Sequence, residues 1–316
     1  MRITNAMMTN TYLTNLNRAS GKLTQYSQQL ASGEAFLRAS DDVTAATKSM
    51  LVYANLSRVK QYQDSVESAK AILTQTETSI TEITNLVSRS YELGLKASNG
   101  VYSQSELESI VQELLEIKSE IVHSANTIFA NVYIFGGANT TSAPFEIKVE
   151  DGKEVLYYNG YSIDELAKEE NKEIYEKLIG DHIIHPIGYG ENINISVNGI
   201  ELMGVGEDNT FNILNNLISA LRSADSEKIQ EYTAQLQNKQ DTMLSIQGTL
   251  GAKQNRLEYY AARLESDNYN FTVRYGDLIS VDTTELIVKY TAQELVYRAA
   301  LSSAKYIVLD TLAAYL

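Results

Sequence analysis

Cysteine and tryptophan are absent from this sequence of 316 residues. The lack of cysteine excludes disulfide bonds, thiol nucleophiles and thiolate metal sites together. Proline is almost absent as well, and its two occurrences, Pro144 and Pro186, lie near the middle of the chain. Because proline is the strongest helix breaker, the flanks on both sides of this middle stretch are free to form long helices.

Positive charge is also scarce. The chain carries 26 Lys and Arg residues against 40 Asp and Glu residues, which gives a net charge of -14. Since phosphate groups would be repelled by this field, we expect neither nucleic acid nor an anionic membrane surface as a partner. The opening stretch "MRITNAMMTN" lacks the apolar run of roughly 7–15 residues found in secretory signals. We therefore expect no cleaved signal peptide.

Both flanks show apolar residues at alternating steps of four and three residues, a spacing that places them on one seam of a helix. In the N-terminal flank the spacing predicts helices to about Leu30, from about Val43 to Ala97, and from Leu107 to Ile128. In the C-terminal flank one register runs from Ile229 to Leu264. The misfits in that register are Lys239 and Lys253, whose long stems can leave such a seam. A last helix is predicted from about Thr283 to the end.

The middle of the chain has a different character. "PFEIKVEDGKEVLYYNG" alternates and contains Asp151-Gly152, which predicts a hairpin, and a similar pattern surrounds Asn198-Gly199. Between them, residues 162–180 read as one short acidic helix, with Ser162 and Glu165 as a capping box.

The expected fold is mainly α. It is a long antiparallel helical rod or coiled coil built from both chain ends, with a small inserted β-rich (α+β) domain. We expect residues 1–40 with 281–316 to form a terminal coiled-coil segment that is disordered in the monomer. Residues 41–135 with 210–280 would form the helical rod domain, and residues 136–209 the small outer domain.

Few residues offer chemistry. His182 and His185 stand three apart beside Asp181, and a metal site is the sharper interpretation of that group. However, residues i and i+3 of a strand point to opposite faces, so exposed histidines are the favoured interpretation. The glycine pairs at 188/190 and 204/206 lack a full phosphate-loop pattern and fit turns better. We predict no catalytic residue, no metal site and no cofactor.

The chain ends on "VYRAALSSAKYIVLDTLAAYL", which is unusually apolar for a terminus. A membrane anchor is one interpretation, but Lys305 and Asp310 would each cost about 2.5–3.5 kcal/mol within a bilayer. The favoured interpretation is a helix that other protein chains cover, and that orders on assembly together with the N-terminal helix. The predicted assembly interface consists of Tyr12, Leu16, Leu23, Leu30, Leu295, Leu301, Leu309, Leu312 and Leu316.

Two segments resemble a known family. "QQLASGEAFLRASDDVTAATKSM" is similar to the N-terminal signature of the bacterial flagellins and their junction proteins. "LGAKQNRLEYYAARLESDNYNF", followed by "DLISVDTTELIVKYTAQELVYRAALSSAK", resembles the C-terminal signature of that family. Within the family, "NTIFANVYIFGGANTTSAPFEI" resembles the junction proteins that lie between the flagellar hook and the filament.

The resemblance implies a structural subunit of the flagellum that turns over no small-molecule substrate. Its implied partners are further copies of itself in a ring, the other hook-associated junction protein, flagellin and a type III export chaperone. Its implied location is extracellular, after export through the flagellar channel without cleavage. Two alternatives stay open: flagellin itself, and an enzyme carried on a filament scaffold.

Overall fold

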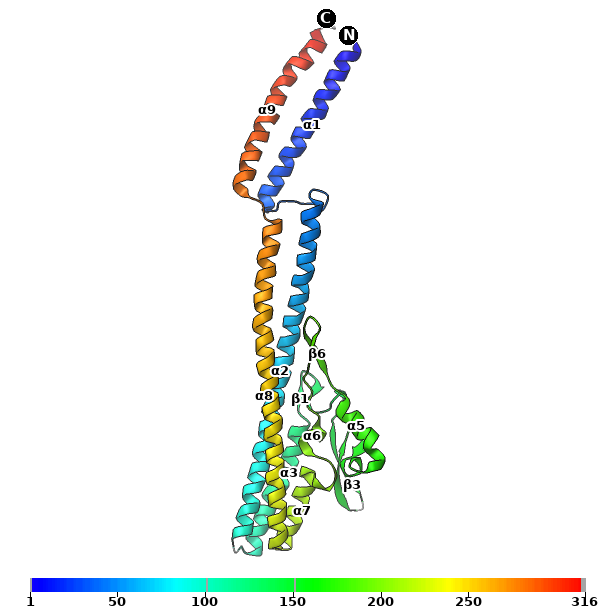
Figure 1. Ribbon diagram of the computed structural model, residues 1–316, viewed down its shortest axis with the longest axis vertical. Coiled ribbons are helices and arrows are strands. Elements are labelled where there is room, and N and C mark those ends of the chain that lie inside the picture. The colour runs from blue at the N-terminus through cyan, green and yellow to red at the C-terminus, as the bar shows by residue number, and fades with distance from the viewer. Residues whose placement is uncertain (1, 101, 151, 314–316) are drawn as a thin grey trace. The chain divides into compact units, whose positions relative to one another are not determined.

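The computed structural model describes residues 2–100, 102–150 and 152–313, with side chains for those of them that lie between 7 and 303. Helices dominate, and the short strands lie in the middle of the chain (Figure 1). The prediction of a mainly α fold with a small inserted α+β domain is therefore confirmed. Contacts divide the chain into two compact units. We call residues 1–59 with 266–316 the terminal unit and residues 60–265 the central unit; the three-part division predicted above stays a prediction.

The terminal unit is built around two antiparallel helices, α1 (Arg2–Ser32) and α9 (Thr283–Ala313), which lie side by side in Figure 1. The Tyr12 hydroxyl of α1 donates a hydrogen bond of 2.6 Å to the Ala300 carbonyl of α9. About two turns further on, the Gln293 amide donates to the Ala19 carbonyl at 3.2 Å. The first and the last helix of the described chain are thus held together by polar contacts as well as by their seam.

The segments that follow α1 and precede α9 contact each other, and we call this structure the joint (residues 33–42 and 280–282). Gly33 adopts φ +74, a left-handed conformation that favours glycine and ends α1. The Ala35 N–H donates to the Ile279 carbonyl at 2.7 Å, and the Val281 N–H donates to the Gly33 carbonyl at 3.0 Å. The next helix, α2 (Val43–Asn99), begins after Asp42, whose carboxylate accepts the Ala45 N–H.

In the central unit, α2 packs antiparallel to α8 (Ser226–Ile279), with α3 (Gln104–Ala125) and α7 (Thr210–Arg222) beside them. Heptad positions of α8 supply its buried side, from Ile229 to Leu264. The antiparallel order is visible in two contacts: the Gln247 amide donates to the Thr81 hydroxyl, and the Gln254 amide donates to the Glu77 carboxylate. Few helix breakers and a continuous apolar seam together explain helices of 57 and 54 residues.

Small antiparallel sheets form the inserted domain. One contains β3 (Phe145–Glu150), β4 (Lys153–Tyr158) and β5 (Tyr161–Ser162) in that order. The pairs β1 (Ile128–Phe129) with β2 (Val132–Tyr133) and β6 (Ile184–Gly188) with β7 (Glu191–Asn194) complete the sheets of the described residues. Short helices connect the strands: α4 (Ile163–Leu166), the 3-10 turn η1 (Glu169–Asn171), α5 (Lys172–Gly180), α6 (Gly199–Met203) and the 3-10 turn η2 (Gly206–Asp208).

Tyr158 is the centre of this domain's core. Its side chain is fully buried, packs on the Phe145 ring at 5.1 Å between centroids, and donates its hydroxyl hydrogen to the Phe135 carbonyl. Burial raises the pKa of the Tyr158 hydroxyl to about 12, so the group stays neutral and serves as a hydrogen-bond donor. The predicted hairpin is confirmed by the antiparallel pairing of β3 with β4, in which Glu150 lies opposite Lys153; Asp151 of its turn lies outside the described residues.

Three local predictions are wrong. The third helix ends at Ala125, and Ile128 is an exposed residue of β1. Residues 162–180 form α4, η1 and α5 rather than one helix, and the Ser162 side chain makes no capping hydrogen bond. Asn198-Gly199 is not a hairpin turn but the start of α6, where a side chain at position 199 would collide with the Phe145 ring.

Candidate functional site: the apolar surface of the terminal unit

The α1 members of the predicted interface lie on one seam of that helix. Tyr12 contacts α9 directly through its hydrogen bond to Ala300. Leu16, Leu23 and Leu30 follow on the same seam and are half-buried. The pairing of α1 with α9 therefore covers these residues only in part, and each keeps surface that a further chain could cover.

The α9 members are more exposed. Leu295 is 70% exposed and Leu301 is 45% exposed. The side chains of Leu309 and Leu312, and residue Leu316 as a whole, lie outside the described residues. The structure thus brings Tyr12, Leu16, Leu23 and Leu30 together on one face and leaves Leu295 and Leu301 turned to solvent.

Sequence reasoning missed a second set of exposed apolar residues, next to the joint. They come from the start of α2 and the end of α8 and are Val43, Met50, Leu51, Tyr53, Tyr269 and Val273. The signal was present in the sequence, because these residues fall off the heptad seam of their helices. Beside them, Phe36, Leu37 and Met50 line a depression of 160 Å³ at the joint.

Most of the exposed large apolar side chains of the described residues belong to the terminal unit, although it is the smaller unit. The members on α1 and α9 are Met7, Met8, Leu13, Ile287, Val288, Leu295, Val296 and Leu301. Exposed apolar surface that gathers in one part of a soluble protein marks interaction sites. Such a surface can bind other helices.

The histidines do not form a metal centre within the described part of the chain. His182 precedes β6, and its Nδ1 lies 3.5 Å from the Ser196 hydroxyl. His185 is part of β6, and partial burial lowers its pKa. The side chains that the structure describes contain no group of three His, Asp or Glu placed to hold a metal ion.

The other buried charge of the central unit is structural. Lys118 of α3 is buried, pairs with Glu154 of β4 and donates to the Asn215 amide oxygen at 2.8 Å. Its ammonium group also lies 4.9 Å from the centre of the Phe211 ring. Because Glu154, Asn215 and the Phe211 ring surround its ammonium group, this lysine joins the hairpin to α3 and α7.

The sequence also left a membrane anchor open as an interpretation of the C-terminal end. None of the helices, as far as they are described, is long and apolar enough to cross a bilayer.

Comparison with known proteins finds similarity to flagellar proteins. Residues 3–140 match the family model of the bacterial flagellin N-terminal helical region. The chain is also 25% identical over 311 residues to flagellar hook-associated protein 3 of Escherichia coli K12, and the match covers 95% of each chain. The chain is therefore similar to the flagellin N-terminal region over residues 3–140 and to flagellar hook-associated protein 3 over almost its whole length.

Two further comparisons concern a flagellin and a solved structure. Flagellin of Salmonella muenchen is 29% identical over 142 residues, which is 45% of this chain and 28% of that flagellin. The crystal structure of flagellar hook-associated protein 3 from Legionella pneumophila superposes with a TM-score of 0.60 at 12% identity. This alignment covers 72% of this chain and 98% of the other. At that identity the likeness concerns the fold alone.

Proposed function

We propose that this protein is a structural subunit of the bacterial flagellum that forms the junction between hook and filament. One observation carries the proposal: the match to flagellar hook-associated protein 3 runs along 95% of both chains, whereas the match to flagellin covers 45% of this chain. A junction subunit needs the fold of its whole length, including the inserted domain. A full-length match supports that role better than a shared N-terminal region does.

The subunits would assemble into a ring through the apolar surface of the terminal unit. The half-buried seam of Tyr12, Leu16, Leu23 and Leu30, and the exposed Leu295 and Leu301, support this. We infer that Leu309, Leu312 and Leu316 complete the interface. The face of the ring toward the hook would bind the other hook-associated junction protein, and the opposite face would receive flagellin.

The remaining parts of the proposal follow from the same role. The chain would be exported through the flagellar channel without cleavage, would bind an export chaperone beforehand, and would act outside the cell. Its work would be mechanical, as an adaptor between two tubes, and it would catalyse no reaction. No cofactor, nucleic acid or small-molecule substrate is part of this role.

Immunogold labelling of purified hook–filament structures tests the proposal. Antibody raised against the inserted domain should label only the base of the filament, where it meets the hook. Label along the whole filament would instead identify the protein as flagellin, which matches this chain over 142 residues. Absence of label from the structures would overturn both assignments.

A further inference from the structure

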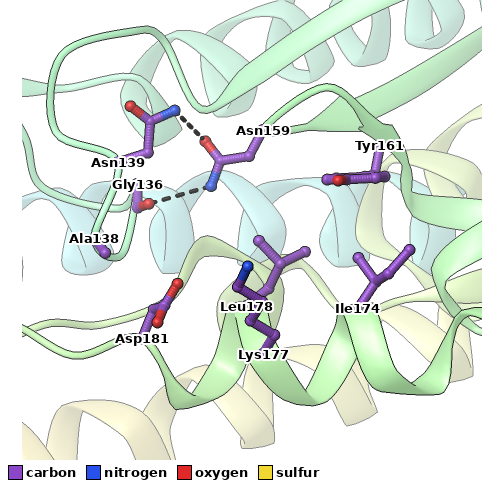
Figure 2. A pocket seen from close by; sticks show the side chains of 9 residues that line it. All are labelled: Gly136, Ala138, Asn139, Asn159, Tyr161, Ile174, Lys177, Leu178 and Asp181. Atoms are coloured by element: carbon purple, nitrogen blue, oxygen red, sulfur yellow. Dashed lines mark hydrogen bonds between the residues drawn. The ribbon is translucent and has the colours of Figure 1, made fainter.

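The inserted domain contains a depression that the proposed assembly does not use. It has a volume of 270 Å³ and lies between α5 and the turn that joins β4 to β5 (Figure 2). Ile174 and Leu178 point toward it from α5, and the ring of Tyr161 faces them from β5. The depression therefore has an apolar floor and one aromatic wall.

Two amide side chains are fixed at its edge. The Asn139 amide donates to the Asn159 side-chain oxygen at 3.2 Å, and the Asn159 amide donates to the Gly136 carbonyl at 3.2 Å (Figure 2). Asn159 itself has φ +49 in the tight turn between β4 and β5. The Asn139 amide also donates to the Ser142 hydroxyl at 2.9 Å, so both of its donors are used within the domain. The two amides thus form a fixed edge of the depression.

Two opposite charges lie at the other edge. Lys177 and Asp181 stand one turn apart at the end of α5, yet neither forms an ion pair with the other or with any other described residue. The Tyr161 hydroxyl has no hydrogen-bond partner among the described residues either. Three polar groups that converge on one depression are thus available to a ligand.

The charge balance of these groups limits the ligand class. One cation and one carboxylate leave the lining neutral, which does not favour a phosphate group, and no acidic cluster that could hold a metal ion exists among the described residues. A neutral ligand with hydroxyl groups can accept from Lys177 and donate to Asp181 at the same time. An apolar face on the same ligand would pack against Tyr161 and Leu178.

We propose that this depression binds a single pyranose ring of a saccharide. The ring's C–H face lies against the Tyr161 side of the depression, and its hydroxyl groups bond to Asp181 and Lys177. The inference rests on the inserted domain alone and does not depend on the role in the flagellum.

Saturation-transfer NMR on the full chain tests the inference, with methyl glycosides of glucose, galactose, mannose and N-acetylglucosamine as probes. At least one glycoside should receive saturation from the protein. Tyr161→Ala and Asp181→Asn should each weaken its affinity at least tenfold. Tyr189→Ala is the matched control, because Tyr189 is an exposed tyrosine at the tip of the β6–β7 hairpin and should leave the affinity unchanged.

Thermal melting of each variant separates lost binding from lost folding. Should Tyr161→Ala fail to fold, Lys177→Met replaces it, because Lys177 is an exposed residue with no described partner. Absence of saturation for all four glycosides overturns the inference. So does binding that survives both pocket substitutions, or binding of free glycine in place of the glycosides, which would identify the Lys177–Asp181 pair as a site for a zwitterion.

Discussion

At the scale of single residues, Gly94 of α2 marks a close approach of α2 to α8. A Cβ atom at this position would lie 2.4 Å from the Thr233 hydroxyl oxygen. Thr233 cannot easily move, since it is buried, β-branched and hydrogen-bonded to the Ile229 carbonyl at 2.6 Å. The two longest helices therefore meet at a position that admits only glycine.

Gly94→Ala should lower the free energy of unfolding by about 1–3 kcal/mol, because the added methyl group overpacks the contact. Gly248→Ala is the matched control. Gly248 lies within α8 with open space around it, so alanine there should stabilise the protein by about 0.5–1 kcal/mol through helix propensity. Urea unfolding measures both values, and effects of the same sign would contradict the close approach.

Leu114 of α3 is fully buried, and Leu244 of α8 is exposed. Leu114→Ala should therefore cost about 2–5 kcal/mol of stability through lost burial and the cavity left behind. Leu244→Ala should change it by no more than about 0.5 kcal/mol. Equal midpoints of thermal unfolding for the two variants would show that the apolar seam of α3 is not part of the core.

Leu295 and Val149 are exposed to nearly the same extent, 70% and 71%, in different units. Leu295→Asp should leave the melting temperature of the monomer unchanged and abolish assembly, because it places a charge in the proposed interface. Val149→Asp should affect neither property. Motility of cells that carry each variant, together with the melting curve, checks this; normal motility with Leu295→Asp would remove α9 from the interface.

At the scale of elements, α8 has two heptad rows of residues that differ in burial. Leu236, Met243 and Leu250 occupy the buried row, whereas Lys239 and Lys253 occupy the second row at half burial. Burial lowers the pKa of both lysines. Each also has a carboxylate of the inserted domain nearby, Asp208 for Lys239 and Glu201 for Lys253, whose charge acts in the opposite direction.

This division explains which elements could be predicted. The heptad pattern predicted the bounds of α2 and the end of α1 to within a few residues, because a continuous seam repeats over many turns. It also predicted α8 from Ile229 to Leu264, although the helix continues to Ile279.

The heptad pattern did not explain why a lysine occupies position 239 of the seam. The ammonium group of Lys239 approaches Gly204, so this side chain faces the inserted domain. The pattern also missed α7, although Asn209 is a suitable N-cap there, because one short helix between turns repeats too few times to be distinctive.

The assembly surface could be predicted only in part, for a related reason. A seam predicts where one helix partner lies, so the α1 members of the interface fall on the α1–α9 face. The exposed residues beside the joint, such as Met50 and Tyr53, lie off the seam, and their exposure depends on how the helices pack.

Deletion of residues 297–316 tests the role of α9 as an element. The central unit has its own core, so the melting temperature of the monomer should change little, while assembly should be lost. Differential scanning calorimetry and sedimentation of the assembled form measure the two effects. A large drop in the melting temperature would show that α9 belongs to the core of the free protein.

At the scale of the whole molecule, buried side chains are distributed unevenly. The central unit contains most of the fully buried residues, whereas α1 and α9 bury few, among them Ala19 and Leu286. At about 25 cal/mol per Å² of apolar surface, a helix pair with so little burial stays close to the cost of its own ordering. Order of the terminal helices should therefore depend on assembly.

Limited proteolysis of the monomer should trim both ends, stop near Asp41 and Val281, and leave one resistant core. Hydrogen exchange should be fast in residues 9–30 and 295–313 of the monomer and slow in the assembled form. Light scattering on the same sample confirms that it is monomeric. Slow exchange at both ends of a confirmed monomer would refute the prediction that assembly orders them.

The hydrogen bond between Tyr12 and Ala300 joins residues that are 288 positions apart in the sequence. At a synthesis rate of about 5–20 residues per second, α9 leaves the ribosome about 15–60 s after the α1 residues that it contacts. For that interval the seam of α1 has no partner on its own chain, while the central unit can already begin to fold. Pairing of the two ends can therefore occur only after the whole chain has been made, and a protein that binds α1 has at least this interval in which to act.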